Sequence, residues 1–130
     1  MLRRVDCLFL FVAALQLAVG SALGIWMGLV QDLSFRPVHA HMNLMGWASL
    51  AVFGLTYRAF PRLGALRLAR AHFIVAVLAT ICFPFGLYRL SQGQDGGVIG
   101  IVGIGLWLIS AGLFAVATLR LVLSNAEFAD

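Results

Sequence analysis

Charged residues are scarce in this 130-residue chain: Asp, Glu, Lys and Arg make up 11% of it, and hydrophobic residues make up 62%. A soluble domain carries about a quarter charged residues, so this composition argues against a water-soluble fold. Lysine is absent, and all nine basic residues are arginines. The only two cysteines, Cys7 and Cys82, have no second cysteine near either of them. This spacing argues against a disulfide framework and against a cysteine-based metal site.

Four apolar segments follow one another, at about residues 7–30, 38–60, 69–90 and 98–123. Each is close to the roughly 20 residues that a helix needs to cross a bilayer. Pro37 and Pro61 stand where the second segment begins and ends, as is typical of helix boundaries. The sequence therefore predicts an all-α, polytopic membrane protein in which residues 1–130 form a single bundle of four transmembrane helices.

The arginines predict how this bundle is oriented. Arg36 and Arg89 fall on one side of it, and seven others fall on the opposite side: Arg3, Arg4, Arg58, Arg62, Arg67, Arg70 and Arg120. Positive residues collect on the cytoplasmic side of a membrane, so we expect both termini in the cytoplasm. This pattern suits a multi-pass protein of the bacterial inner membrane. It also explains the net charge of +4 without nucleic-acid binding, because the arginines lie between apolar runs.

Small and amide side chains predict how the helices pack. Gly20, Gly24 and Gly28 recur at four-residue spacing on the first helix and form a stripe that another helix backbone can approach. We expect contacts within the chain, with contacts between chains as the alternative. Gln16, midway along the same helix, is expected to face the bundle and to find a polar partner there.

His39 and His41 lie just inside the outer end of the second helix. Ionisable side chains inside a membrane usually have a function, although a hydrogen-bonded packing role is the alternative. Residues two apart point about 200° apart around a helix, so the two rings cannot hold one metal ion together. This excludes a zinc site of the His-x-x-x-His kind. The pair suits haem iron, which takes one axial ligand from each side of the porphyrin.

Neighbouring polar and sulfur-containing residues extend the two histidine faces. Asn43 follows His39 by one turn and Met45 follows His41 by one turn, as supporting or packing residues. His72 lies near the opposite entry of the third helix, most of a roughly 30 Å core away. We therefore place it outside the haem site and expect its side chain to reach toward the interface, with a proton or quinone contact as the alternative.

The histidine count predicts an oligomer. One chain offers His39 and His41 but has no further histidine at that depth to oppose them. The opposing ligands must then come from other copies. A ring in which His39 of one protomer and His41 of the next hold a haem at each interface satisfies every ligand. We expect three or more subunits.

Three stretches carry a family resemblance: residues 39–47 (HAHMNLMGW), 53–61 (FGLTYRAFP) and 67–73 (RLARAHF). They resemble small four-helix proteins related to subunit I of haem-copper oxidases and nitric-oxide reductases. In that family a His-x-His pair on one core helix serves two haems, and the helices form arcs of four. The resemblance implies that His39 and His41 are axial ligands of haem b, and that the chain forms one such arc in a homotrimer.

The resemblance also bears on the rest of the site. It implies that Arg36 and Arg89, on the outer side, neutralise haem propionates, with solvated loop arginines as the alternative. The further ligands that the family uses for a second metal are missing, so copper is not expected and enzymatic activity stays open.

A haem with two histidine ligands has no open position, so electron transfer is the predicted function, with quinol or a respiratory protein as partner. The alternatives are a protein that binds or reduces oxygen or nitric oxide, and a haem-free accessory subunit of a larger oxidase.

Overall fold

The computed structural model describes residues 4–126, and every regular element among them is a helix. Three helices are long: α1 (Val5–Val30), α5 (Arg67–Ser91) and α6 (Gly97–Ala126). Each has a stretch long and apolar enough to cross a membrane. The predicted all-α fold is thus confirmed for the described residues, and the apolar helices indicate a membrane protein. Arg3, which contributed to the predicted orientation, lies outside them.

The second predicted crossing consists of three consecutive helical segments. α2 (Arg36–His41) passes directly into a π-helix, η1 (Met42–Ser49), and then into α3 (Leu50–Ala59). A π-helix bonds residues five apart, and the Ser49 hydroxyl adds a 2.8 Å bond to the carbonyl of Leu44. A short helix, α4 (Pro61–Gly64), leads on to α5. Both prolines stand at helix boundaries as predicted: Pro37 lies in the first turn of α2, and Pro61 follows the end of α3 and begins α4. Nothing in the hydropathy pattern predicted the π-helix.

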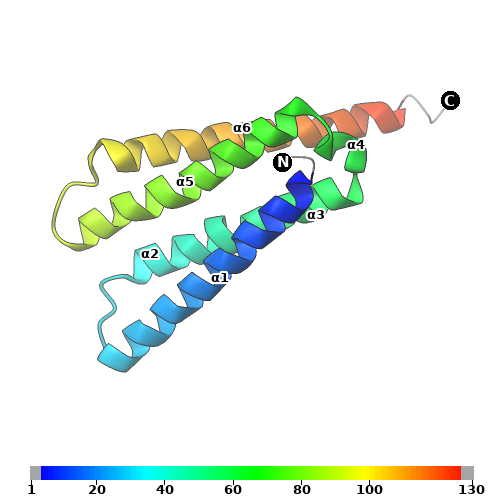
Figure 1. Ribbon diagram of the computed structural model, residues 1–130. Coiled ribbons are helices and arrows are strands. Elements are labelled where there is room, and N and C mark those ends of the chain that lie inside the picture. The colour runs from blue at the N-terminus through cyan, green and yellow to red at the C-terminus, as the bar shows by residue number, and fades with distance from the viewer. Residues whose placement is uncertain (1–3, 127–130) are drawn as a thin grey trace.

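The helices pack in two pairs. Figure 1 shows α1 beside the run from α2 to α3, and α5 beside α6. The second pair packs backbone against backbone, because a Cβ atom on Gly86 would lie 2.5 Å from the Cα atom of Gly100. Gly105 and Gly112 have nothing within 4 Å and face away from the described part of the chain. Some glycines of the fourth segment therefore serve packing within the chain, and others do not.

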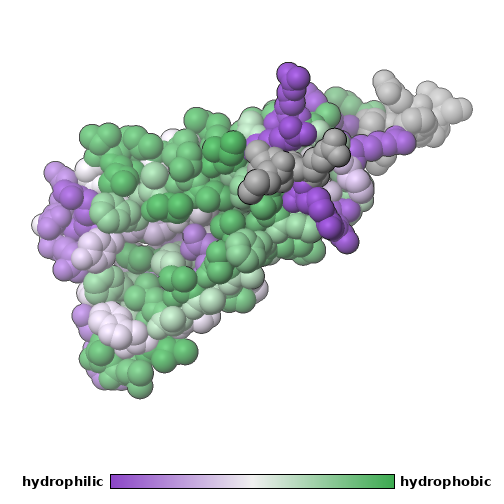
Figure 2. Space-filling view, in the orientation of Figure 1, coloured by the Kyte–Doolittle hydropathy of each residue, from purple (hydrophilic) through white to green (hydrophobic). Residues whose placement is uncertain are grey.

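The two ends of the molecule differ in charge. Figure 1 places the connections at residues 31–35 and 92–96 at one end, which we call the loop end; it carries Arg36 and Arg89. Residue 4, α4 and the last part of α6 lie at the other, arginine-rich end, which carries Arg4, Arg58, Arg62, Arg67, Arg70 and Arg120. Between the ends, Figure 2 shows a mostly apolar surface. The described arginines thus divide between the ends as predicted.

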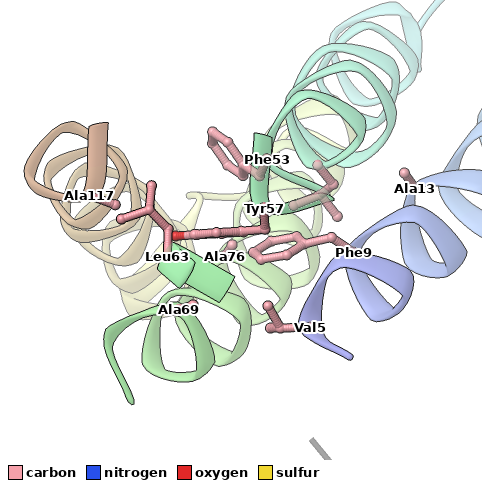
Figure 3. Close-up of a cluster of buried hydrophobic side chains, with 10 residues drawn as sticks. Val5, Phe9, Ala13, Phe53, Tyr57, Leu63, Ala69, Ala76 and Ala117 are labelled. Atoms are coloured by element: carbon pink, nitrogen blue, oxygen red, sulfur yellow. The ribbon is translucent and has the colours of Figure 1, made fainter. Parts of the chain in front are cut away.

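The core lies toward the arginine-rich end and is built from aromatic rings and small residues (Figure 3). Phe9 of α1 stacks on Tyr57 of α3 at 5.7 Å between ring centroids and meets Phe53 edge-on at 5.8 Å. Ala76 of α5 and Ala117 of α6 are buried beside them. The small alanines let the rings reach all four helical runs, so this cluster joins them.

Gln16 occupies the middle of α1 and packs into the bundle. Its side-chain amide donates to the Thr80 hydroxyl of α5 at 3.5 Å. Gly46 of η1 gives it room, since a Cβ atom there would lie 2.8 Å from the Gln16 amide carbon. The predicted polar partner of Gln16 is therefore Thr80.

Candidate functional site

His39 and His41 lie in the last turn of helix α2, directly before the π-helix η1. The His39 ring lies against α1, where its Nδ1 atom is 2.9 Å from the carbonyl oxygen of Gly20. The His41 ring meets Phe83 of α5 edge-on, with 5.0 Å between centroids and 82° between planes. The two-residue spacing predicts this divergence: the rings face different helices and do not share a ligand position.

Hydrogen bonds to backbone carbonyls orient both imidazoles. The Nδ1 atom of His41 is 2.8 Å from the carbonyl oxygen of Pro37, and that of His39 bonds Gly20. A carbonyl only accepts, so each Nδ1 atom carries the proton and donates it. The neutral ring then holds its lone pair on Nε2, which bonds no other residue among positions 4–123. Metal-ligating histidines commonly have this arrangement.

Asn43 lies next to His39, one turn further along, as predicted. Its side-chain amide donates to the His39 carbonyl at 2.9 Å and lies 3.4 Å from the His39 Nδ1 atom. Met45, by contrast, is buried within the π-helix, where it has a packing role. Asn43 is therefore the residue that supports the position of His39.

Glycines of α1 make room for these side chains. A Cβ atom on Gly24 would lie 2.7 Å from the Cε1 atom of His39, and one on Gly20 would lie 3.0 Å from the Asn43 amide nitrogen. Gly28 has nothing within 4 Å among the described atoms. Gly20 and Gly24 thus make room for side chains of α2 and η1, and they do not serve a close approach between helix backbones.

The charges at the loop end are partly paired. Arg89 lies 3.6 Å from the Asp95 carboxylate, and its Nε atom donates to the Asp95 carbonyl at 3.1 Å. The backbone N–H of Ser34 donates to Asp32 and holds the pKa of that carboxyl below its usual range. Arg36 is exposed and forms no ion pair with the rest of the described chain. Arg36 is thus the freer of the two arginines for an anionic group such as a propionate.

His72 does not reach toward the membrane interface, and that expectation is wrong. Its side chain is fully buried, with its Nδ1 atom 2.9 Å from the Tyr57 hydroxyl and its Nε2 atom 3.0 Å from the Ser110 hydroxyl. Phe53 packs against the ring at 4.6 Å between centroids. His72 lies more than one turn inside α5 and faces α3 and α6, where two hydroxyl groups satisfy it. Neither ring nitrogen is free to bind iron.

Sequence reasoning missed this cluster of Tyr57, His72 and Ser110. The available signal was the presence of hydroxyl residues in two other apolar segments, Tyr57 and Ser110 among them, since polar groups inside a membrane pair with one another. Within residues 4–126, no three His, Cys, Asp or Glu side chains gather as they would around a metal ion. His39 and His41 therefore each leave one ring nitrogen, Nε2, without a hydrogen-bond partner in the described part of the chain.

Comparison of the chain with protein-family models, with curated proteins and with solved structures gives no match. The resemblance to subunit I of the haem-copper oxidases accordingly stays a prediction from the residues that carry it.

Proposed function

We propose that this chain is a membrane protein that binds b-type haem through His39 and His41 and transfers electrons. The observation that carries this proposal is the geometry of the two rings. They face opposite neighbours, each gives its Nδ1 proton to a backbone carbonyl, and each keeps its Nε2 lone pair unengaged in the described chain. A single helix thereby offers one axial ligand to each of two haems.

The proposal includes a fourth membrane crossing, formed by the run from α2 through η1 to α3. At about 1.5 Å of rise per residue this run is long enough for a hydrocarbon core of roughly 30 Å. The arginine-rich end then faces the cytoplasm, by the excess of positive residues there, and both termini lie on that side. The loop end, with the histidines nearby, faces outward from a bacterial inner membrane.

The haem sites lie between copies of the chain in this proposal. Each protomer supplies one nitrogen to each of two interfaces, and His72 has none to spare because both of its nitrogens are bonded. A closed ring in which His39 of one copy faces His41 of the next completes every site. A homotrimer fits the four-helix arcs of the resembled family.

Electron transfer is the activity that such ligation favours. When bound, haem would supply a one-electron redox centre, and His39 and His41 would be the residues that hold its iron. The backbone carbonyls of Gly20 and Pro37 orient the imidazoles, Asn43 lies beside His39, and the exposed Arg36 would neutralise a propionate. The partner that exchanges electrons with it is quinol or a respiratory protein.

An absorption spectrum and a mass measurement in mild detergent test the proposal together. Protein purified from haem-replete cells is expected to show a low-spin bis-histidine spectrum and the mass of an oligomer, a trimer in the favoured arrangement. Rapid spectral change with carbon monoxide would instead indicate a gas-binding haem. A colourless protein that co-purifies with a larger oxidase would indicate an accessory subunit.

Replacing Gly24 with alanine is expected to reduce haem occupancy severalfold. The added methyl group would overlap the His39 ring at 2.7 Å and push it away from its carbonyl partner. Gly28→Ala is the matched control, because it lies one turn further on the same helix with open space around it. The ratio of haem to protein absorbance measures the effect. Equal occupancy in both variants would contradict the proposed role of His39.

A further inference from the structure

A cavity of about 270 Å³ lies at the arginine-rich end, between the start of α1, the end of α3 and helix α4. Arg4, Asp6 and Arg58 line it together with Tyr57 and Gly64. It is far from the histidine pair, which lies toward the loop end. Whatever this cavity binds is therefore independent of the proposed haem.

The charges around the cavity leave an excess of positive donors. The Asp6 carboxylate bonds the Arg58 Nη1 atom at 3.1 Å, so its charge is neutralised within the chain. The Arg58 side chain is nevertheless 59% exposed, and its remaining N–H groups are open to another partner. The Arg4 guanidinium makes no hydrogen bond or ion pair with residues 5–123. Two guanidinium groups and one carboxylate thus line the cavity, which leaves one positive charge in excess.

The start of α1 also lies at this cavity. This helix has 26 residues, its N-cap residue Arg4 makes no side-chain hydrogen bond to it, and in its first turn the Asp6 carboxylate accepts from the backbone N–H of Cys7. The remaining N–H groups of this turn and the helix dipole favour an anion at such an end. A phosphate group there would receive hydrogen bonds from guanidinium groups, which suit it geometrically.

The surroundings of the cavity suit a lipid better than a free ion. Apolar side chains cover the same helices directly toward the membrane centre: Phe11 and Leu15 of α1 are 62% and 50% exposed, and Leu55 of α3 is 57% exposed. Phe11 and Leu15 lie four residues apart and so share one face of α1. Acyl chains can lie along these side chains while the headgroup occupies the cavity.

We propose that this cavity binds the phosphate of an anionic phospholipid, with Arg4 and Arg58 as its ligands. Basic pockets at the cytoplasmic side of helix bundles bind such headgroups by this chemistry. The remaining arginines of this end, Arg62, Arg67 and Arg70, attract the same lipids without forming the cavity. The site thereby fixes the start of α1 against α3 and α4.

Native mass spectrometry of the purified protein in neutral detergent tests this site. Phosphatidylglycerol is the probe, and phosphatidylcholine, which has the same phosphate but no net charge, is the comparison. Arg4→Gln is expected to weaken phosphatidylglycerol binding about fivefold, the effect of losing one arginine near a membrane surface. Arg4 precedes the helix and is exposed, so helix content by circular dichroism should not change. Arg4→Lys, which keeps the charge, should retain most of the binding.

Arg120→Gln, at the same end but outside the cavity, is the matched control and is expected to bind like the wild type. Equal weakening by Arg4→Gln and Arg120→Gln would mean diffuse attraction, and equal binding of both lipids would mean no charge selection. Either result overturns the site. Saturation by inorganic phosphate at the same affinity as the lipid would assign the cavity to a free anion and overturn the lipid proposal. None of these outcomes depends on the haem spectrum.

Discussion

Replacing His41 with alanine is expected to abolish the low-spin haem spectrum completely, and replacing His39 is expected to do the same. In a closed ring every haem is held by one His39 and one His41, so either substitution removes one ligand from all haems at once. The loss should appear in the reduced absorption spectrum as conversion to a high-spin form or as loss of haem. Two separate haem types, each bound by one kind of histidine, would instead leave about half of the low-spin signal.

Added imidazole provides the control for this experiment. It can enter the space left in His41→Ala and restore six-coordinate iron, if the substitution removed only a ligand. Helix content and oligomeric mass should stay unchanged, because His41 is only partly buried and bonds only its own helix. A wild-type spectrum in His41→Ala would refute axial ligation by this residue.

Replacing His72 with alanine is expected to destabilise the protein by about 3 kcal/mol without changing the ligation of haem. The fully buried ring packs against Phe53 and Phe114 and bonds both Tyr57 and Ser110. Its removal leaves a cavity and two hydroxyl groups without their partner. Thermal unfolding in detergent, followed by circular dichroism, measures the loss.

His72→Phe separates the two contributions to this stability. Phenylalanine fills most of the space but makes neither hydrogen bond, so its cost should be about 1 kcal/mol, the usual worth of two such bonds inside a membrane protein. A smaller loss for alanine than for phenylalanine would contradict the packing role of the ring. Loss of the low-spin spectrum in a folded His72→Phe protein would place His72 in the haem site after all.

Local sequence pattern was enough to predict those features that depend on a single segment of the chain. Hydropathy predicted the helices, because a run of about 20 apolar residues leaves few alternatives to a membrane helix. The two prolines predicted where the second segment begins and ends. The two-residue spacing of His39 and His41 predicted rings on different faces, since a helix turns about 100° per residue. Asn43 was placed beside His39 by the same periodicity.

The role of His72 was mispredicted because it depends on partners distant in sequence. Its bonding partners are Tyr57 and Ser110, and Ser110 is 38 residues away on another helix. The closeness of His72 to the start of its helix suggested a side chain at the membrane interface. The direction of that side chain is instead set by how α5 meets α3 and α6. The same limit applies to Gln16 and Thr80, which are 64 residues apart.

The sequence by itself thus determined an all-helical membrane protein with one arginine-rich end and two diverging histidines. These properties follow from composition and from the period of a single helix. Tertiary structure alone decided that Gly24 receives the His39 ring, that His72 joins three helices, and that Arg4 and Arg58 share a cavity. Each of these depends on which faces of separate helices meet. No local period encodes that choice, because it is set by close packing of side chains from distant segments.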